Sequence, residues 1–159
     1  MSAQLAELPT GRPARPALSH EAVTQGFDRV IEEAILGSLI LVPKSIPTIL
    51  EVLSADDFLL PSHQAIFAAI RDLQGEGEPV DPFTISDRLQ GSAEFDAKDG
   101  RDYLLLLAAL PTTAYDTLHQ AHILKRQALE RRARTLASEF LGGDLGLAEL
   151  YEGCGRLLE

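Results

Sequence analysis

The sequence predicts an all-α protein, in which a small globular bundle of about five helices precedes an extended antiparallel helical hairpin. Apolar residues recur at the three- and four-residue spacing of buried helix faces, and no segment alternates apolar and polar residues as a strand does. Proline and glycine mark the ends of these segments. We expect residues 1–26 to form a disordered tail, residues 27–112 the globular head and residues 113–159 the hairpin.

The first predicted helix covers residues 27–41. The tail before it contains prolines among small residues and few large apolar groups, a composition typical of disorder. The helix ends before Pro43, because a proline disfavours the helical conformation of the preceding residue. Gly37 lies inside the helix, where glycine costs about 1 kcal/mol relative to alanine. This cost predicts that another helix approaches closely at Gly37.

The next two predicted helices cover residues 45–53 and 62–74. Between them, Phe58 is expected to plug the core together with the neighbouring leucine. Ser62 is a candidate N-cap of the second of these helices. The glycines that end at Gly77 are expected to terminate it.

A fourth helix, over residues 83–89, is predicted to start at Asp81 or Pro82. Residues 91–100 are polar and flanked by glycine, which predicts a loop. Residues 103–110 are almost wholly apolar, so we expect a short fifth helix that is covered on most sides.

A long helix is predicted from Thr112 or Thr113 to Leu141, followed by a turn at two glycines and a last helix over residues 145–158. The glycines of that last helix are expected to weaken it. Apolar residues cover more than half of the circumference of the long helix, which is broader than one antiparallel partner requires. We therefore expect a second chain to cover the hairpin, through Leu118, Leu124, Leu129, Leu136, Phe140, Leu147, Leu150, Tyr151, Leu157 and Leu158. The alternative is that the long helix folds back on its own head as core.

The charge of the chain argues against strong binding to nucleic acid. The net charge is −10 and the pI about 4.8, whereas phosphate binding requires clustered cations. The long helix carries a basic run between Lys125 and Arg134. These bases point in different directions around the helix, so ion pairs with nearby acids are expected instead of a DNA-binding stripe.

The sequence offers no catalytic group and no metal site. Adjacent carboxylates do not face each other on a helix, and His119 and His122 lack a third ligand type nearby. His63 is expected to be a packing or capping group. The single cysteine, Cys154, cannot form an internal disulfide. No apolar run approaches the ~20 residues of a membrane span. The N-terminus has no charged region followed by an apolar region, so no secretory signal is visible. These features favour the cytoplasm.

Four groups of residues follow one another in a characteristic order. They are Glu32 with Ala34-Ile-Leu-Gly37; Asp57-Phe58 with Pro61-x-His63 and Ile66-Phe67; Gly77-Glu-Pro-Val-Asp81; and Gly100 with Tyr103-Leu104. Together they resemble the N-terminal domain of bacterial replicative DNA helicases, the DnaB family. By this resemblance, the structural positions of the family fall on Gly37, Phe58, His63, Phe67, Gly100 and Tyr103. The chain departs from the family pattern at Asp99, Gln120 and Gln127.

The resemblance implies a role as the collar of a hexameric ring, built as a trimer of dimers through the hairpins. It also implies docking of the C-terminal domain of primase and, in some species, of a helicase loader, with little direct DNA binding. The chain contains no Gly-x-x-x-x-Gly-Lys-Ser/Thr loop. ATP and Mg²⁺ are therefore expected only in a downstream motor domain that this chain lacks, and the chain itself is expected not to be an enzyme. Two alternatives stay open: the helicase-binding domain of primase, and a free-standing helicase adaptor or loader.

Overall fold

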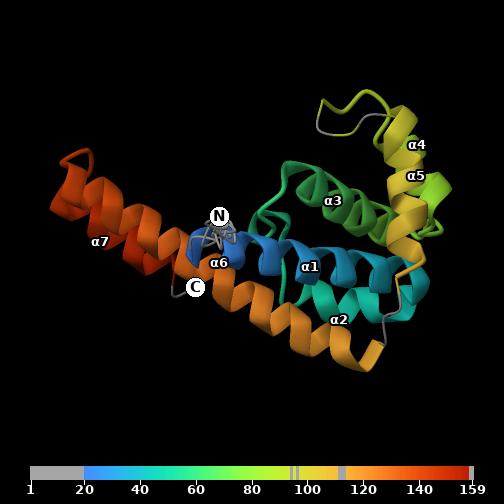
Figure 1. Cartoon of the computed structure of the whole chain (residues 1–159), viewed down its shortest axis with the longest axis horizontal. Helices are drawn as coiled ribbons and strands as arrows, with labels where there is room; N and C mark the ends of the chain where they lie inside the picture. Colours follow the sequence, from blue (N-terminus) through green and yellow to red (C-terminus); the bar gives the residue numbers. More distant parts are fainter. Residues whose placement is uncertain (1–19, 94, 96, 111–113, 158–159) are drawn as a thin grey trace, which may run out of the picture.

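The computed structural model describes residues 20–93, 95, 97–110 and 114–157, and within them it contains helices and turns but no strand (Figure 1). This confirms the all-α prediction. The α-helices are α1 (His20–Leu41), α2 (Ile46–Leu50), α3 (Pro61–Glu76), α4 (Pro82–Arg88), α5 (Ala97–Ala108), α6 (Ala114–Gly142) and α7 (Leu147–Arg156). Two short 3-10 helices, η1 (Pro43–Ser45) and η2 (Ala55–Asp57), flank α2.

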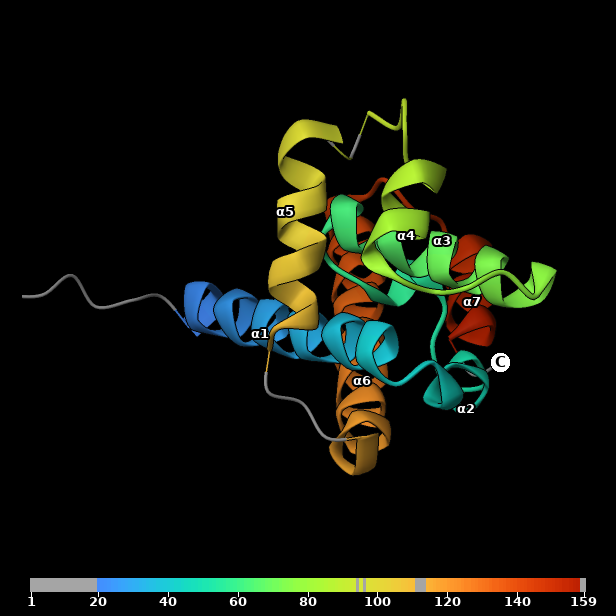
Figure 2. The ribbon, with the colours of Figure 1, turned by 90° about the vertical axis from the view of Figure 1, so that its right-hand side faces the viewer.

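The core of the head forms around α1, which contacts α3, α5 and the first half of α6. Figure 2 shows α5 standing across α1. Ile35, Leu36 and Leu39 of α1 are completely buried, and full burial of each such side chain contributes about 1.5–3 kcal/mol. Phe58 and Phe67 close the core from the η2–α3 side, with ring centroids 4.8 Å apart. The predicted place of Phe58 in the core is confirmed.

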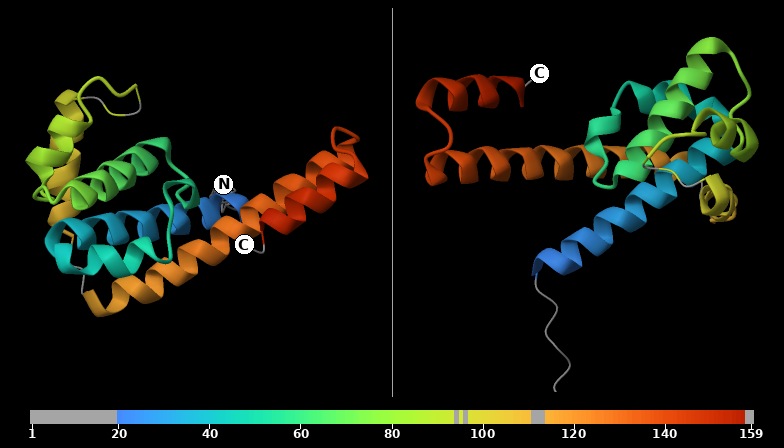
Figure 3. Two further views of the ribbon diagram at one scale, coloured as in Figure 1. Left: turned by 180° about the vertical axis from the view of Figure 1, so that it is seen from behind. Right: turned by 90° about the horizontal axis from the view of Figure 1, so that it is seen from above.

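The long helix α6 belongs to two parts of the molecule. Its first half lies along α1, where Ala121, Leu124 and Ala128 are buried in the core. Its second half leaves the head and pairs with α7, so that the two helices project as a hairpin (Figures 1 and 3). One continuous helix therefore joins the head to the hairpin.

The predicted start of α4 and end of α3 are confirmed. Asp81 caps α4, and its side chain accepts hydrogen bonds from the backbone N–H groups of Phe83 and Thr84, at 2.7 and 3.0 Å. Gly77 ends α3 with a φ of 73°, a left-handed conformation that glycine adopts without strain. Ser62 is not the N-cap, because α3 already begins at Pro61, whose fixed φ suits the first helical position.

Two boundaries and one burial prediction are corrected by the structure. Residues 20–26 belong to α1 and not to the tail, whereas residues 1–19 lie outside the described part of the chain. Helix α5 starts at Ala97, earlier than predicted. It is not covered on most sides: Leu104 and Leu107 are buried, but Leu106 is 58% exposed. The reason is that α5 lies at the edge of the head and packs mainly on α1 and α4.

The close approach predicted at Gly37 is confirmed. A Cβ atom placed on Gly37 would lie 2.3 Å from the carbonyl oxygen of Leu107. Because this neighbour is a backbone atom of α5, it cannot move aside as a flexible side chain would. The crossing of α1 and α5 therefore requires glycine at this position.

We expect Gly37→Ala to lower the free energy of unfolding by about 1–3 kcal/mol, because the added methyl group overpacks the crossing. Urea unfolding followed by circular dichroism measures this change. Gly75→Ala is the matched control, since a Cβ there has nothing within 4 Å and alanine favours the helix. Equal stability of the Gly37→Ala variant and the unchanged protein would contradict the close packing of α1 on α5.

Candidate functional site on the helical hairpin

The hairpin turns at glycine, as the sequence predicts. Gly143 has a φ of 82°, and its N–H donates to the carbonyl of Phe140 at 3.2 Å. The N–H of Gly146 then donates to the Glu149 carboxylate at 2.8 Å, which starts α7. Helix α7 returns along α6 toward the head (Figure 3).

Gly153 lets the two helices of the hairpin approach each other. A Cβ on Gly153 would lie 2.8 Å from Cδ2 of Leu136. The sequence suggested that the glycines of the last helix weaken its pairing. At Gly153 a larger residue would require the end of the flexible Leu136 side chain to shift, and the weakening by the glycines stays a prediction.

The hairpin carries an apolar groove, which we call the hairpin groove. Its volume is about 310 Å³. It is lined by Ala133, Leu136, Ala137, Phe140 and Leu141 of α6 and by Leu150, Cys154 and Leu157 at α7. Leu141 is 85% exposed at its edge, and on α7 the side chains of Leu147 and Tyr151 are 74% and 82% exposed. Large apolar side chains are thus gathered on the part of the molecule that the head does not cover.

The residues that were predicted to contact a second chain lie in different environments: some line the groove, some are exposed on α7 and some belong to the head. Those in the groove are Leu136, Phe140, Leu150 and Leu157; those exposed on α7 are Leu147 and Tyr151. Leu124 is wholly buried in the core of the head, so the alternative of a helix folded back on its own head holds for that half of α6. Leu129 is partly buried, Leu118 is 37% exposed near the start of α6, and Leu158 lies outside the described residues.

Ion pairs fix the base of the hairpin to the head. The Asp57 carboxylate, completely buried in η2, lies 3.0 Å from Lys125 Nζ and 3.0 Å from Arg132 Nη2. Arg131 donates to Asp28 of α1 at 3.0 Å and also to the backbone carbonyl of Asp57. The prediction that the basic run forms ion pairs is confirmed.

The Asp28 carboxyl lies where α1 and α6 cross, and it is 2% exposed. Its burial raises the pKa of the carboxyl above the ordinary value, and the opposing attraction of Arg131 is the smaller effect. The carboxyl is therefore held by one strong partner in a place that disfavours its charge.

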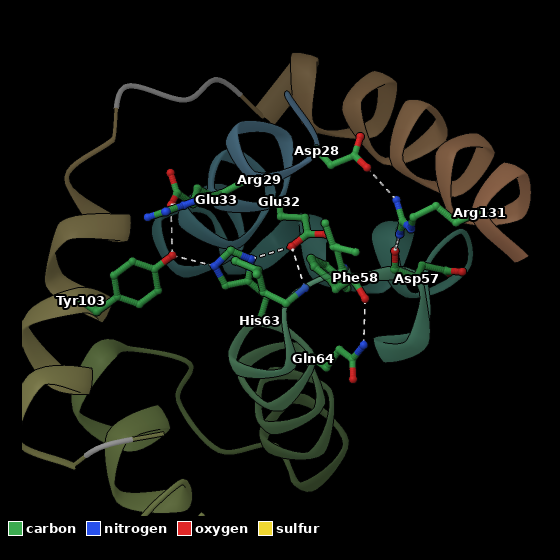
Figure 4. Close-up of polar contacts among 12 residues, drawn as sticks. Asp28, Arg29, Glu32, Glu33, Asp57, Phe58, His63, Gln64, Tyr103 and Arg131 are labelled. Carbon is green, nitrogen blue, oxygen red and sulfur yellow. Dashed lines mark hydrogen bonds and ion pairs between the residues drawn. The ribbon is translucent and has the colours of Figure 1, made fainter. Parts of the chain in front are cut away.

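A second polar chain runs through the head (Figure 4). The Glu32 carboxylate accepts from the backbone N–H groups of Leu59 and Leu60, and it lies 2.7 Å from Nδ1 of His63. Nε2 of His63 lies 2.6 Å from the hydroxyl of Tyr103. Of the two expected roles, packing fits His63, which is completely buried; it is not a cap, because α3 has no side-chain cap hydrogen bond.

This series of hydrogen bonds ends at the surface of α1. The Tyr103 hydroxyl donates to Glu33 at 3.2 Å, and Arg29 donates to the same carboxylate at 2.8 Å. Burial raises the pKa of Tyr103 far above its ordinary value, so the phenol keeps its proton. The arrangement links α1, α3 and α5 and serves the fold.

The histidines of α6 lie away from the hairpin groove. His119 and His122 line a separate cleft of about 600 Å³, between α2 and the start of α6. Within the residues that the structure describes, no three His, Cys, Asp or Glu side chains are grouped to hold a metal ion. The hairpin groove is therefore the surface that the chemistry of this chain favours as a functional site.

The sequence pattern of the DnaB-like helicase N-terminal domain matches residues 25–126. The chain belongs to this family. A replicative DNA helicase DnaB of Leifsonia xyli is 33% identical over 69% of the chain and 24% of its own length. One of Mycobacterium leprae is 35% identical over 66% of the chain and 17% of its own length. The chain thus spans about a quarter or less of these curated relatives.

A solved structure agrees with this family assignment. The crystal structure of the N-terminal domain of DnaB helicase from Mycobacterium tuberculosis has a TM-score of 0.69 and 30% sequence identity to this DnaB-like domain. The match covers 82% of the chain and 94% of that structure. The residues quoted for the resemblance therefore belong to a shared fold.

Among the described residues, no single helix is long and apolar enough to cross a membrane. Two neighbouring core segments, Asp28–Leu41 and Pro43–Leu50, reach that length and composition only together, with a bend of 110° between them.

We expect Asp57→Asn to lower the free energy of unfolding by about 3 kcal/mol, because it leaves two cations beside a buried group that no longer carries charge. Thermal and urea unfolding measure the loss. Asp72→Asn is the matched control: the ion pair of Asp72 with Arg71 is exposed, and such pairs contribute at most about 1 kcal/mol. Similar losses in the two variants would show that Asp57 does not hold the hairpin to the head.

Proposed function

We propose that this chain is the collar domain of a replicative DNA helicase, which assembles a ring by self-association of its hairpins and has no catalysis of its own. The observation that supports this most directly is the hairpin groove. Its apolar lining lies on two helices that extend beyond their own head, and covering one large apolar side chain contributes about 1.5–3 kcal/mol. A second hairpin of the same shape provides the apolar surface that such a groove requires.

The relatives named replicative DNA helicases are about four times as long as the matched region or longer. We assign ATP hydrolysis, Mg²⁺ binding and DNA translocation to the remainder of such a protein, because the chain has no phosphate-binding loop. ATP hydrolysis and DNA translocation would take place at replication forks in the cytoplasm.

We further propose that the head docks the C-terminal domain of primase, and in some species a helicase loader. The support is the family membership together with the acidic head, because residues 28–116 carry 16 acidic and 6 basic residues and this charge favours a partner with a basic surface. The alternative, that the chain is the helicase-binding domain of primase, is disfavoured by the match to the DnaB-like domain and to DnaB helicases.

We expect Leu141→Asp and Phe140→Asp to shift the chain toward monomers, because a charge buried without a partner opposes association. Sedimentation equilibrium measures the mass. Leu141 is 85% exposed in the single chain, so its substitution spares the fold. Phe83→Asp is the control, because Phe83 is 61% exposed on the head, away from the hairpin.

Cys154 gives an independent measurement. It is the only cysteine and it lines the groove, so association should slow its alkylation by a maleimide. An unchanged mass of the Leu141→Asp variant, with alkylation that does not depend on protein concentration, would rule out the groove as the contact.

We expect the affinity for the C-terminal domain of primase to fall as NaCl is raised, because salt screens attraction between an acidic head and a basic partner. Titration calorimetry at several salt concentrations measures this. Affinity that does not change with salt would indicate an apolar docking site instead.

An immunoblot of lysate from the source cells distinguishes the helicase from a free-standing adaptor or loader. A band several times heavier than 17.3 kDa would support the helicase, whereas a band at this mass would support the adaptor.

A further inference from the structure

The base of the hairpin carries more cations than its carboxylate partners neutralise. Lys125 and Arg132 share the single buried carboxylate of Asp57, each at 3.0 Å. Arg131 donates to the Asp28 carboxylate at 3.0 Å, and its second donor goes to the backbone carbonyl of Asp57 (Figure 4). Three cations of α6 therefore face two buried carboxylates.

A fourth cation, Arg156, lies at the end of α7. It is exposed and has no ion pair with another residue that the structure describes. A guanidinium group holds its five N–H donors in a rigid fork that matches the oxygens of a phosphate or carboxylate. Arg156 can therefore offer paired donors to an anion from outside the chain.

The arginines meet at one pocket, which we call the arginine pocket. Its volume is about 620 Å³, and sites for small ligands commonly measure about 300–1,000 Å³. It is lined by Asp56, Arg131, Arg132, Thr135, Leu136, Gly153, Arg156 and Leu157. Three guanidinium groups thus share one concave surface with a single carboxylate.

Apolar groups form another part of the pocket lining. Leu136 comes from α6 and Leu157 follows α7, and between them Gly153 is buried. Ligand pockets commonly combine apolar walls with a few charged groups that fix the orientation of the ligand. The arginine pocket has both kinds of wall.

A long polyanion is disfavoured at this place. Residues 135–155, which form the tip and most of α7, contain four acidic residues and no basic residue, and the head is acidic as well. Strong binding of nucleic acid requires many phosphate contacts along its length. A strand that crossed the pocket would meet acidic surface beyond it, whereas a small anion can enter the pocket alone.

We propose that the arginine pocket binds a small ligand that carries two linked phosphate groups, such as a nucleoside diphosphate. Three guanidinium groups match the several oxygens of a diphosphate, because each can make two parallel hydrogen bonds. Leu136 and Leu157 offer an apolar surface to the rest of the ligand. The proposal is binding alone, without a reaction. It goes beyond the proposed collar function and does not rest on self-association.

Titration calorimetry with pyrophosphate and with adenosine diphosphate tests this proposal. Both should bind more tightly than sulfate at equal ionic strength. Arg156→Gln should weaken both by about tenfold, because one charge-assisted contact is lost. Arg126→Gln is the matched control and should leave both affinities unchanged, since Arg126 is an exposed arginine of α6 that does not line the pocket. Circular dichroism verifies the fold of both variants.

A second variant separates the pocket from the contact between copies. Leu136 and Leu157 line the arginine pocket and also the hairpin groove, whereas Leu141 lines only the groove. The affinity for adenosine diphosphate should therefore be the same in Leu141→Asp as in the unchanged chain. Loss of binding in this variant would mean that the anion site forms only between copies, and would overturn a pocket within one chain.

Three further outcomes decide the proposal. It is overturned if neither pyrophosphate nor adenosine diphosphate binds at millimolar concentration, or if Arg156→Gln binds them as tightly as the unchanged chain. Tighter binding of a single-stranded oligothymidylate, lost in Arg156→Gln, would replace the small ligand by nucleic acid. A chain that stays monomeric but binds adenosine diphosphate through Arg156 would contradict the collar function and support this inference.

Discussion

The rest of the structure depends on the buried carboxylate of Glu32. A carboxylate inside a helical core is costly unless several donors surround it. Glu32 meets this demand with the backbone N–H groups of Leu59 and Leu60 and with the imidazole of His63. Helix α1 can therefore take its place in the core only when η2 and the start of α3 are also in place. The same segment presents Asp57 to the bases of α6, so that the position of the hairpin follows from that of α1.

Much of the fold could be predicted from local chemistry. The helical spacing of the apolar residues predicted buried helix faces, and Ile35 and Ile66 on such faces are completely buried. Gly37 indicated a close crossing because glycine in a helix interior needs a compensating reason. Such signals are readable because each depends on a few neighbouring residues.

The remainder depended on contacts between residues far apart in the sequence. Leu124 and Leu136 both belong to the broad apolar arc of α6, yet the first is in the core of the head and the second is in the groove. How far the head reaches along α6 is not readable from that arc. The acidic partners of Lys125 and Arg131 were expected nearby, but Asp57 and Asp28 lie 68 and 103 residues away. Leu106 stayed exposed because α5 lies at the edge, which composition alone does not reveal.

The continuity of α6 has a mechanical consequence. The helix has 29 residues without a break, and its two ends belong to the head and to the hairpin. No flexible joint separates them, and ion pairs from Asp28 and Asp57 brace the junction from two sides. The helix then acts as a rigid strut. In the ring proposed above, a hairpin that tilts against its neighbour would turn the head through the same angle, so small rotations near the base would become large displacements at the outer surface of the head.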